Sequence, residues 1–261
     1  MLLPLIIGHR GASALAPENT LIAFTKAFDD GADGLEFDVH LARDGVPVII
    51  HDDTLKRTGL RAGRIADLTS KELAQIDVGT WFNRKFPARA HPSYASATIP
   101  TLVQLFELVH KRRPVLYVEL KGPDAIDLAA PVTRLIAEYD LKANAIVESF
   151  SHAAVKQVKL ADPTIRTAAL FEPTLTRPKP SAGWLLERAK ECDADEIALH
   201  YSMASRRVVT HLADYGTPVV IWTADKPSWV GRAVRDGIGA IITNNPEVLV
   251  AKRATLRQFG Q

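Results

Sequence analysis

The chain has 261 residues, of which 47% are hydrophobic and 24% charged, and its formal net charge is +2. This near balance gives no electrostatic support for a nucleic-acid or anionic-membrane partner. The single cysteine, Cys192, excludes an internal disulfide framework. The apolar start over residues 1–7 lacks a basic segment and a clear cleavage site, and no stretch approaches the ~18 apolar residues of a membrane span. We therefore expect a cytoplasmic protein with no nucleic-acid partner and no stable membrane association.

Apolar runs of strand length alternate with helical patterns almost to the end of the chain. The expected strands are residues 5–9, 34–41, 115–120, 145–149, 165–171, 196–200, 218–223 and 240–243. The expected helices are residues 20–30, 102–111, 125–139, 152–160, 184–192, 206–215, 228–235 and 246–253. Strands rich in Val, Ile and Leu that alternate with helices are typical of a parallel sheet covered on both faces. This number of units favours an α/β fold of the (β/α)8 TIM-barrel type, as a single domain over residues 1–261, over an open doubly wound sheet.

One segment after the second expected strand departs from this alternation. Asp44-Gly45 is a turn signal, and residues 46–50 read as a strand that returns antiparallel beside residues 34–41. From about residue 54 to 98 the pattern is irregular, with several Gly and Pro residues and a short helix near residues 70–75. Such a stretch is too long for an idle loop in a compact domain. We expect a small insertion above the barrel mouth that covers the site.

Charged side chains gather at the carboxyl ends of the expected strands, where barrel enzymes place their active sites. Glu36 and Asp38 lie at i and i+2 of the second strand, so both project from one face. Glu119 lies on the next barrel strand. Three neighbouring carboxylates repel unless a cation or protons neutralise them, and oxygen ligands suit Mg²⁺ or Ca²⁺, with Mn²⁺ as a third candidate. The alternative is that these carboxylates form salt bridges to Arg10, Lys121 or Arg43.

Two histidines at the ends of expected strands complete this group. His9 ends the first strand and His51 ends the hairpin strand. Imidazole titrates near neutral pH, so the pair forms a natural general acid and general base, although a lone histidine at a strand end is more often structural. Arg10 suits a phosphoryl oxygen because of its fork of donors, although its i+1 position can turn it away from His9. Lys121 either contacts the same phosphate or neutralises Glu119.

Several other residues have two interpretations that the sequence leaves open. Trp222 ends the seventh strand and is either a core aromatic or an apolar wall for a glycerol group. His40 shares the face of Asp38 and either supports the site or lies at a solvated strand end, and His200 ends its strand and either lines the pocket or does not. Trp81 and Phe82 either roof the pocket or pack a small core within the insertion.

Short motifs run in order through nearly the whole chain. They are His9-Arg10-Gly11, Pro17-Glu18-Asn19-Thr20, Gly31-Ala32-Asp33, Glu36-Phe37-Asp38-Val39, Asp44-Gly45-Val46-Pro47-Val48, His51-Asp52-Asp53, Arg57-Thr58, Gly79-Thr80-Trp81-Phe82, Ile99-Pro100-Thr101-Leu102, Glu119-Leu120-Lys121, Ser149-Phe150, Trp222-Thr223 and Ile242-Thr243. In this order the chain resembles the glycerophosphodiester phosphodiesterase family. It departs from the family pattern at Ala42-Arg43, Ser151-His152 and Thr243-Asn244, none of which is a proposed metal or histidine position.

The resemblance implies a (β/α)8 barrel with an inserted segment after the second strand. It also implies a divalent metal held by the residues matching Glu36, Asp38 and Glu119, and acid–base catalysis by those matching His9 and His51. Arg10 and Lys121 match the family's phosphate-side positions. The implied reaction splits a small-molecule glycerophosphodiester into glycerol 3-phosphate and an alcohol, through attack of the glycerol 2-hydroxyl and opening of a cyclic phosphate by water.

Two rival functions remain open. A lysophospholipase D-like enzyme would act on acylated glycerol and would need an apolar groove for the acyl chain near the barrel mouth, which Trp81, Phe82 and Phe86 could supply. A catalytically silent barrel would bind phosphorylated ligands, but the intact histidines and carboxylates argue against it. The sequence does not distinguish the acid from the base.

Overall fold

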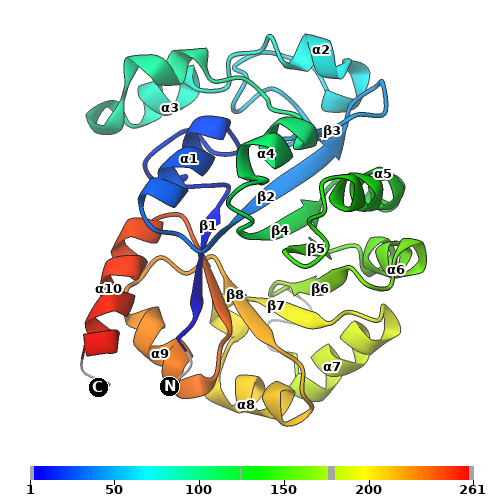
Figure 1. Cartoon of the computed structure of the whole chain (residues 1–261), viewed down its shortest axis with the longest axis vertical. Coiled ribbons are helices and arrows are strands. Elements are labelled where there is room, and N and C mark those ends of the chain that lie inside the picture. The colour runs from blue at the N-terminus through cyan, green and yellow to red at the C-terminus, as the bar shows by residue number, and fades with distance from the viewer. Residues whose placement is uncertain (1–2, 124, 176–179, 259–261) are drawn as a thin grey trace.

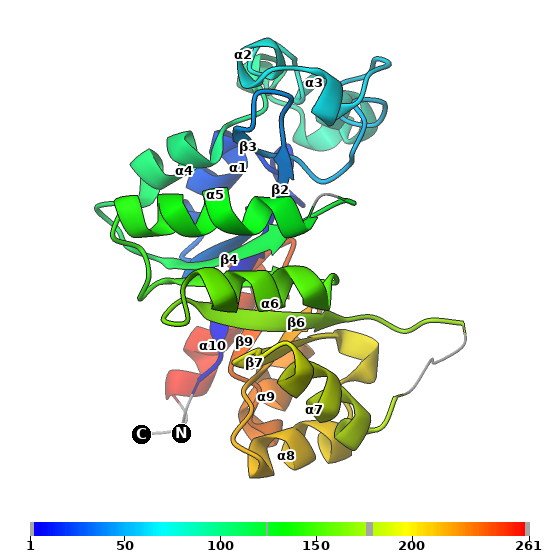
Figure 2. The ribbon, with the colours of Figure 1, turned by 90° about the vertical axis from the view of Figure 1, so that its right-hand side faces the viewer.

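The computed structural model describes residues 3–123, 125–175 and 180–258, which form a parallel barrel inside a ring of helices (Figures 1 and 2). Within these residues the barrel strands follow the order β1-β9-β8-β7-β6-β5-β4-β2, and β1 pairs with β2 to close the ring. The strands are β1 (Leu5–His9), β2 (Gly34–Leu41), β4 (Val115–Leu120), β5 (Ala145–Ser149), β6 (Arg166–Phe171), β7 (Glu196–His200), β8 (Val219–Trp222) and β9 (Ala240–Thr243). The expected (β/α)8 TIM barrel is therefore confirmed.

Helices that follow the strands cover the outside of the barrel. They are α1 (Leu21–Asp29), α4 (Leu102–Val109), α5 (Ala125–Glu138), α6 (His152–Ala161), α7 (Ala182–Glu191), α8 (Arg206–Asp214), α9 (Ser228–Asp236) and α10 (Pro246–Gln258). Five of them, α1, α4, α6, α7 and α8, begin after a side chain that accepts a hydrogen bond from an otherwise unpaired backbone N–H. Thr20 caps α1 in this way, and Ser181 caps α7, which therefore begins two residues earlier than residue 184. No helix among the described residues is long and apolar enough to cross a membrane.

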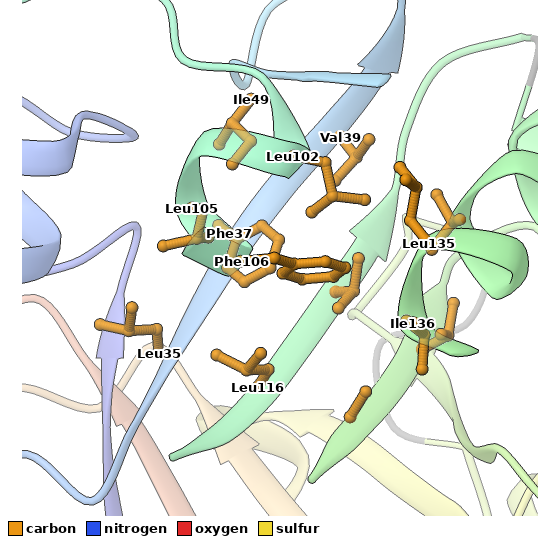
Figure 3. Close-up of a cluster of buried hydrophobic side chains, with 14 of the residues drawn as sticks. Leu35, Phe37, Val39, Ile49, Leu102, Leu105, Phe106, Leu116, Leu135 and Ile136 are labelled. Atoms are coloured by element: carbon orange, nitrogen blue, oxygen red, sulfur yellow. The ribbon is translucent and has the colours of Figure 1, made fainter. Parts of the chain in front are cut away.

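The apolar core lies mainly between the strands and the helix ring. Figure 3 shows one part of it, where Leu102, Leu105 and Phe106 of α4 face Phe37 of β2. A smaller apolar cluster fills the interior of the barrel below the cavity. It includes Ile7, Tyr117, Ile146, Ala168, Leu170, Ala198, Val220, Ala240 and Ile242. Because this interior is packed with side chains, a ligand has access to the barrel from the carboxyl ends of its strands.

The irregular segment after β2 stands apart from the helix ring at one end of the molecule (Figures 1 and 2). β3 (Pro47–Ile49) pairs antiparallel with β2, as the turn at Asp44-Gly45 predicts. The segment continues with η1 (Ile65–Asp67), α2 (Ser70–Leu73), α3 (Thr80–Lys85), η2 (Pro87–Arg89) and η3 (Pro92–Ser96). The segment has its own apolar cluster, which comprises Ala42, Val48, Ile50, Leu55, Ile65, Leu73, Ile76, Val78 and Ile99. Outside this segment, a further short 3-10 helix, η4 (Tyr201–Met203), follows β7.

The aromatic residues of this insertion pack within it. Trp81 is 7% exposed and Phe82 is fully buried. Their rings meet edge to face with centroids 5.8 Å apart, and Phe82 also contacts Tyr94. Neither residue is among those that line the cavity at the barrel mouth. Of the two interpretations of these aromatics, the structure therefore favours the insertion core over the pocket roof.

Candidate active site

A cavity of about 450 Å³ opens at the carboxyl ends of the barrel strands. Its lining residues are His9, Arg10, Glu36, His51, Glu119, Lys121, Glu148, Phe150, Leu170, Glu172, Trp222 and Ile242. Eight residues were predicted to catalyse, to bind the metal or to contact the substrate. Seven of them line this cavity, namely His9, Arg10, Glu36, His51, Glu119, Lys121 and Trp222, and the eighth, Asp38, lies fully buried beside them.

The turn after β1 explains why glycine follows His9 and Arg10. Gly11 has a φ of +83°, and a Cβ atom there would lie 2.5 Å from the carbonyl carbon of Ala23 in α1. The chain therefore has room at this position for glycine alone. The tight turn allows Arg10, itself at a φ of 54°, to fold back over β2, where its backbone N–H donates to Glu36 Oε2 at 3.0 Å.

Three carboxylates form a buried cluster beneath the cavity. Glu36, Asp38 and Glu119 are 2%, 0% and 7% exposed, and one oxygen from each lies within 4.8 Å of the others. β2 and β4 pair with Asp38 opposite Glu119, which creates this proximity. Burial and the charges of Asp38 and Glu119 raise the pKa of Glu36 well above its usual value. Burial and the charge of Asp38 raise the pKa of Glu119 to about 8.

Two cations neutralise part of this cluster. Arg10 Nε lies 3.1 Å from Asp38 Oδ2, and Lys121 Nζ lies 3.1 Å from Glu119 Oε1 and 3.5 Å from Asp38 Oδ1. Burial opposes ionisation of Asp38, but Arg10 and Lys121 outweigh it and hold the pKa of this carboxyl well below its usual range. The salt-bridge alternative therefore holds for Arg10 and Lys121. It is wrong for Arg43, whose guanidinium pairs with Glu72 in the insertion.

The residues present nevertheless fit a divalent cation. Asp38 Oδ1 is buried and has no hydrogen-bond partner among the described residues. Glu36 faces His9 Nε2 at 3.8 Å, and this contact is ionic only when His9 is protonated. Three converging carboxylates, in which Asp38 Oδ1 accepts no hydrogen bond among the described residues and has the ion-pair contact with Lys121, form an oxygen donor set of the kind that Mg²⁺, Ca²⁺ and Mn²⁺ prefer. The cluster could therefore hold a metal ion.

His9 is fixed by a residue from the far end of the chain. Asn244 Nδ2 donates to Asp225 Oδ2 at 2.8 Å, so Asn244 Oδ1 turns toward His9 Nδ1 and lies 2.6 Å from it. Nδ1 therefore carries the ring hydrogen and donates it, which leaves Nε2 as the basic nitrogen near Glu36. Burial and the neighbouring charge of Arg10 lower the pKa of His9 to about 4. The ring is neutral at physiological pH.

His51 has a charged partner instead. Its Nδ1 lies 2.6 Å from Asp52 Oδ1, and Arg57 donates to both oxygens of Asp52 at 2.7 and 3.0 Å. Arg57 also binds both oxygens of Glu18 at 2.8 Å, and Glu18 accepts from Arg10 at 2.9 Å. A continuous polar chain therefore connects His51 to the carboxylate cluster. Burial lowers the pKa of His51, whereas the hydrogen bond to Asp52 acts in the opposite direction.

The remaining histidines have supporting positions. His40 is 7% exposed, and its Nε2 lies 3.0 Å from the His51 carbonyl oxygen, to which it donates. His200 packs edge to face against Trp222, with centroids 5.4 Å apart, and is not among the cavity-lining residues. Trp222 does line the cavity, and its ring also meets Phe150 at 5.4 Å. Phe150, which directly follows β5, and Trp222 of β8 thus form an aromatic wall of the cavity.

Several site residues were not among the sequence candidates. They are Glu18, Asn19, Asp52, Arg57, Asn244 and Glu148. Asn19 donates to Asp38 Oδ2 at 2.7 Å and so supports the carboxylate cluster. Glu148 had a visible signal, because it is an acidic residue inside the apolar strand 145–149, as Glu36 is in its own strand. Arg57 stands in one of the motifs that carry the family resemblance, which gave it no role, and the contact of Asn244 with His9 depends on loop geometry that the sequence pattern does not indicate.

Comparisons with known proteins agree with this geometry. The pattern of the glycerophosphoryl diester phosphodiesterase family matches residues 9–248. A glycerophosphodiester phosphodiesterase from Caldanaerobacter subterraneus subsp. tengcongensis is 32% identical over 248 residues, which are 94% of this chain and 96% of that protein. An Oleispira antarctica phosphodiesterase, solved in complex with the product sn-glycerol-3-phosphate, is 28% identical with a TM-score of 0.82 over 96% of both chains. A glycerophosphodiester phosphodiesterase from Agrobacterium tumefaciens is 25% identical with a TM-score of 0.78, over 95% of this chain and 100% of that one. The chain belongs to the glycerophosphoryl diester phosphodiesterase family.

Proposed function

We propose that this chain hydrolyses glycerophosphodiesters to glycerol 3-phosphate and an alcohol, with one divalent cation and with His9 and His51 as acid–base pair. The observation that carries the proposal is that both histidines line one cavity above the buried carboxylate cluster. Each ring uses Nδ1 for a fixed hydrogen bond, which leaves Nε2 for the substrate. Membership of the family supports the diester hydrolase activity, and the complex of the Oleispira antarctica relative with glycerol 3-phosphate supports the substrate class.

The cation would be held by Glu36, Asp38 and Glu119, as Mg²⁺, Ca²⁺ or Mn²⁺. When bound, it supplies Lewis-acid stabilisation of negative charge that develops on phosphate and alkoxide oxygens. Its charge would also offset the two causes that raise the pKa values of Glu36 and Glu119, which are burial first and repulsion between the carboxylates second.

Arg10 and Lys121 lie beside the cluster and bind the non-bridging phosphate oxygens. One histidine removes the proton from the glycerol 2-hydroxyl as its oxygen bonds to phosphorus. The other histidine donates a proton to the alcohol oxygen as its bond to phosphorus breaks. Water then opens the resulting cyclic phosphate, and the two rings exchange their roles.

The partners of the two rings favour one assignment. His9 is bound by the neutral amide of Asn244, whereas His51 is bound by the carboxylate of Asp52. A carboxylate behind an imidazole orients the ring and stabilises it in the positively charged form that donates a proton. In the first step we therefore assign the role of base to His9 and the role of acid to His51.

The rival function of a lysophospholipase D-like enzyme receives less support. It would need an apolar groove formed by Trp81, Phe82 and Phe86, but none of the three lines the cavity, and Trp81 and Phe82 are packed within the insertion. The apolar surface that remains near the phosphate side is the wall of Phe150, Leu170 and Trp222. This wall suits a small glycerol or alcohol group in a cavity of about 450 Å³.

The test measures glycerol 3-phosphate release from several glycerophosphodiesters, with chelator and then with metal added back. His9→Ala and His51→Ala are each expected to lower turnover by about 10²–10⁴-fold. His110→Ala is the matched control, because His110 is exposed at the C-terminal end of helix α4, outside the barrel. A diester with a good leaving group needs little protonation, so it should rescue His51→Ala and not His9→Ala. Near-normal turnover of either variant on the natural diester contradicts the acid–base pair, and the absence of release by the wild type supports the silent barrel.

A further inference from the structure

The inner surface of β5 carries a carboxyl group that the mechanism above does not use. Glu148 is 1% exposed and lines the active-site cavity. Its Oε2 atom is buried and has no hydrogen-bond partner among the described residues. Burial, together with the charges of Glu36 and Glu119, raises the pKa of Glu148 well above its usual value. A buried carboxyl oxygen without a hydrogen-bond partner costs free energy, so a ligand that donates to it or accepts from it binds more tightly.

The backbone fixes Glu148 in this orientation. The next residue, Ser149, donates its hydroxyl to the Leu120 carbonyl oxygen at 2.7 Å, which ties the end of β5 to β4. Glu119 and Glu148 are paired across these two strands. Alternation along β5 then places Ile146 and Glu148 on the interior face, with Ile146 in the barrel core and Glu148 one layer higher at the cavity. The carboxyl group is therefore presented to the ligand by a rigid element.

Among the other polar residues of the cavity, Glu172 is exposed, whereas the buried and half-buried ones have partners or proposed roles. Arg10 and Lys121 are cations beside the carboxylate cluster, and both suit the phosphate. His9 and His51 face the attacking and leaving oxygens in the proposed mechanism. The lining of the same cavity also includes the apolar side chains of Leu170 and Ile242. A phosphate oxygen beside an ionised Glu148 would be repelled, so the group that suits this place is an uncharged polar one.

A hydroxyl group meets that requirement in either protonation state of the carboxyl. It donates to a carboxylate oxygen, and it accepts from a protonated carboxyl group. Glycerol in a phosphodiester has two free hydroxyls. In the proposed reaction the 2-hydroxyl attacks phosphorus, so the terminal hydroxyl is the one that remains to be bound.

We propose that Glu148 is a specificity-determining residue that hydrogen-bonds the terminal, non-reacting hydroxyl of the glycerol group. This inference rests on the proposed function. A site that hydrogen-bonds a substrate hydroxyl discriminates against an analogue that lacks it, because the polar group of the protein is then left unpaired. Glu148 thereby distinguishes glycerol diesters from diesters of other vicinal diols.

The experiment compares two substrates and two variants. One substrate is glycerophosphocholine, and the other is its 2-hydroxypropyl analogue, which keeps the attacking hydroxyl and lacks the terminal one. The wild type should prefer glycerophosphocholine in kcat/KM by about 10- to 100-fold, the range for a hydrogen bond to a charged or buried group. Glu148→Leu should lose this preference through a fall in kcat/KM for glycerophosphocholine. Glu148→Gln should retain most of it, because an amide both donates and accepts.

The possible results separate the proposals from one another. Equal kcat/KM of the wild type on both substrates overturns the role of Glu148 without any variant. Preference that persists in Glu148→Leu also overturns it, because the hydroxyl is then bound elsewhere. The rise in Tm on addition of Mg²⁺ should be the same in Glu148→Leu and the wild type, and its loss would make Glu148 a metal ligand instead. Absence of turnover by the wild type on both diesters contradicts the proposed function itself.

Discussion

His9 Nδ1 and Asn244 Oδ1 lie 2.6 Å apart although the two residues are separated by 235 positions in the sequence. Asn244 is itself oriented by Asp225, which accepts hydrogen bonds from its backbone N–H and its side-chain amide, both at 2.8 Å. The Ser13 hydroxyl donates to the same Asn244 oxygen at 2.8 Å. The orientation of the His9 ring is therefore determined by the loop that follows β9.

Asn244→Ala should reduce kcat while the fold remains intact. Without Asn244 the ring of His9 can rotate, and a small displacement of a catalytic group costs about 10²-fold in rate. The measurement is kcat and KM on a glycerophosphodiester, together with Tm. Asn144→Ala is the matched control, because it removes a hydrogen-bonding asparagine that donates to the Arg113 carbonyl oxygen away from the cavity. Equal kinetics of the Asn244→Ala and Asn144→Ala variants would show that Asn244 does not position His9.

The carboxylate cluster should respond differently to two kinds of neutral substitution. Glu36→Gln relieves repulsion within the cluster, so the metal-free variant should be at least as stable as the metal-free wild type. Asp38→Asn removes the partner of Arg10 and Lys121, so the metal-free variant should be less stable. Both variants should lose the rise in Tm that Mg²⁺ or Ca²⁺ produces by binding the folded state. Thermal unfolding in EDTA and in added metal measures both effects.

A wild-type Tm that is the same in EDTA and in saturating metal would contradict the metal site. Equal loss of stability in the two metal-free variants would instead contradict the view that Glu36 is repelled and Asp38 is paired. Glu119→Gln provides a third point. It should behave like Glu36→Gln apart from the loss of its contact with Lys121.

Asp52 should contribute stability in a defined pH range. Burial raises its pKa, but hydrogen bonds from Arg57 and His51 outweigh burial and lower the pKa to about 2. A carboxyl group whose pKa is lower in the folded state stabilises the protein above its unfolded pKa, which is 3.8 for Asp, and loses this contribution as the pH falls toward 2. The difference in unfolding free energy between the wild type and Asp52→Asn should therefore be constant from about pH 7 to 5 and shrink below about pH 4.

Urea unfolding of the wild type and of Asp52→Asn at several pH values measures this difference. Asp53→Asn, which removes an exposed neighbouring carboxylate, is the control for a general change in charge. If the difference in unfolding free energy between the wild type and Asp52→Asn instead increased as the pH falls, its sign would contradict a lowered pKa of Asp52. In that case the chain from His51 to Arg57 would not be formed in solution.

Phe82→Ala should mainly change stability rather than substrate preference. Phe82 is fully buried and touches the rings of Trp81, Phe86 and Tyr94. Truncation of a buried phenylalanine costs about 3–5 kcal/mol. Tm should fall clearly, while the ratio of kcat/KM values for a short-headgroup diester and a lysophospholipid remains that of the wild type. A changed ratio with an unchanged Tm would return Phe82 to the pocket roof.

The arrangement of the strand ends could be predicted because it follows from alternation along single strands. Glu36 and Asp38 share a face since they are two residues apart, and Glu119 and Lys121 do so on their own strand. In a closed parallel barrel such pairs converge without any knowledge of loop structure. This is why the carboxylate cluster and the two histidines, His9 and His51, were accessible from the sequence.

The residues that orient these side chains could not be predicted from the sequence in the same way. The contact of Asn244 with His9 depends on the pairing of β1 with β9, which a pattern along one strand does not encode. The bridge from Arg57 to Glu18 depends on the path of an irregular loop. Trp81 and Phe82 were ambiguous because a buried aromatic and a pocket-lining aromatic have the same local pattern. Their orientation depends on packing between distant segments.

Closure of the barrel has a consequence for the order of events during synthesis of the chain. β1 is the first strand of the barrel along the chain, and β9, which pairs with it, is the last. Until β9 docks, His9 has neither its strand neighbour on that side nor Asn244 to orient its ring. A nascent or truncated chain that ends before β9 therefore carries both histidines and all three carboxylates without a correctly aligned His9. If His9 has the role proposed for it, we expect no hydrolysis before β9 has docked against β1.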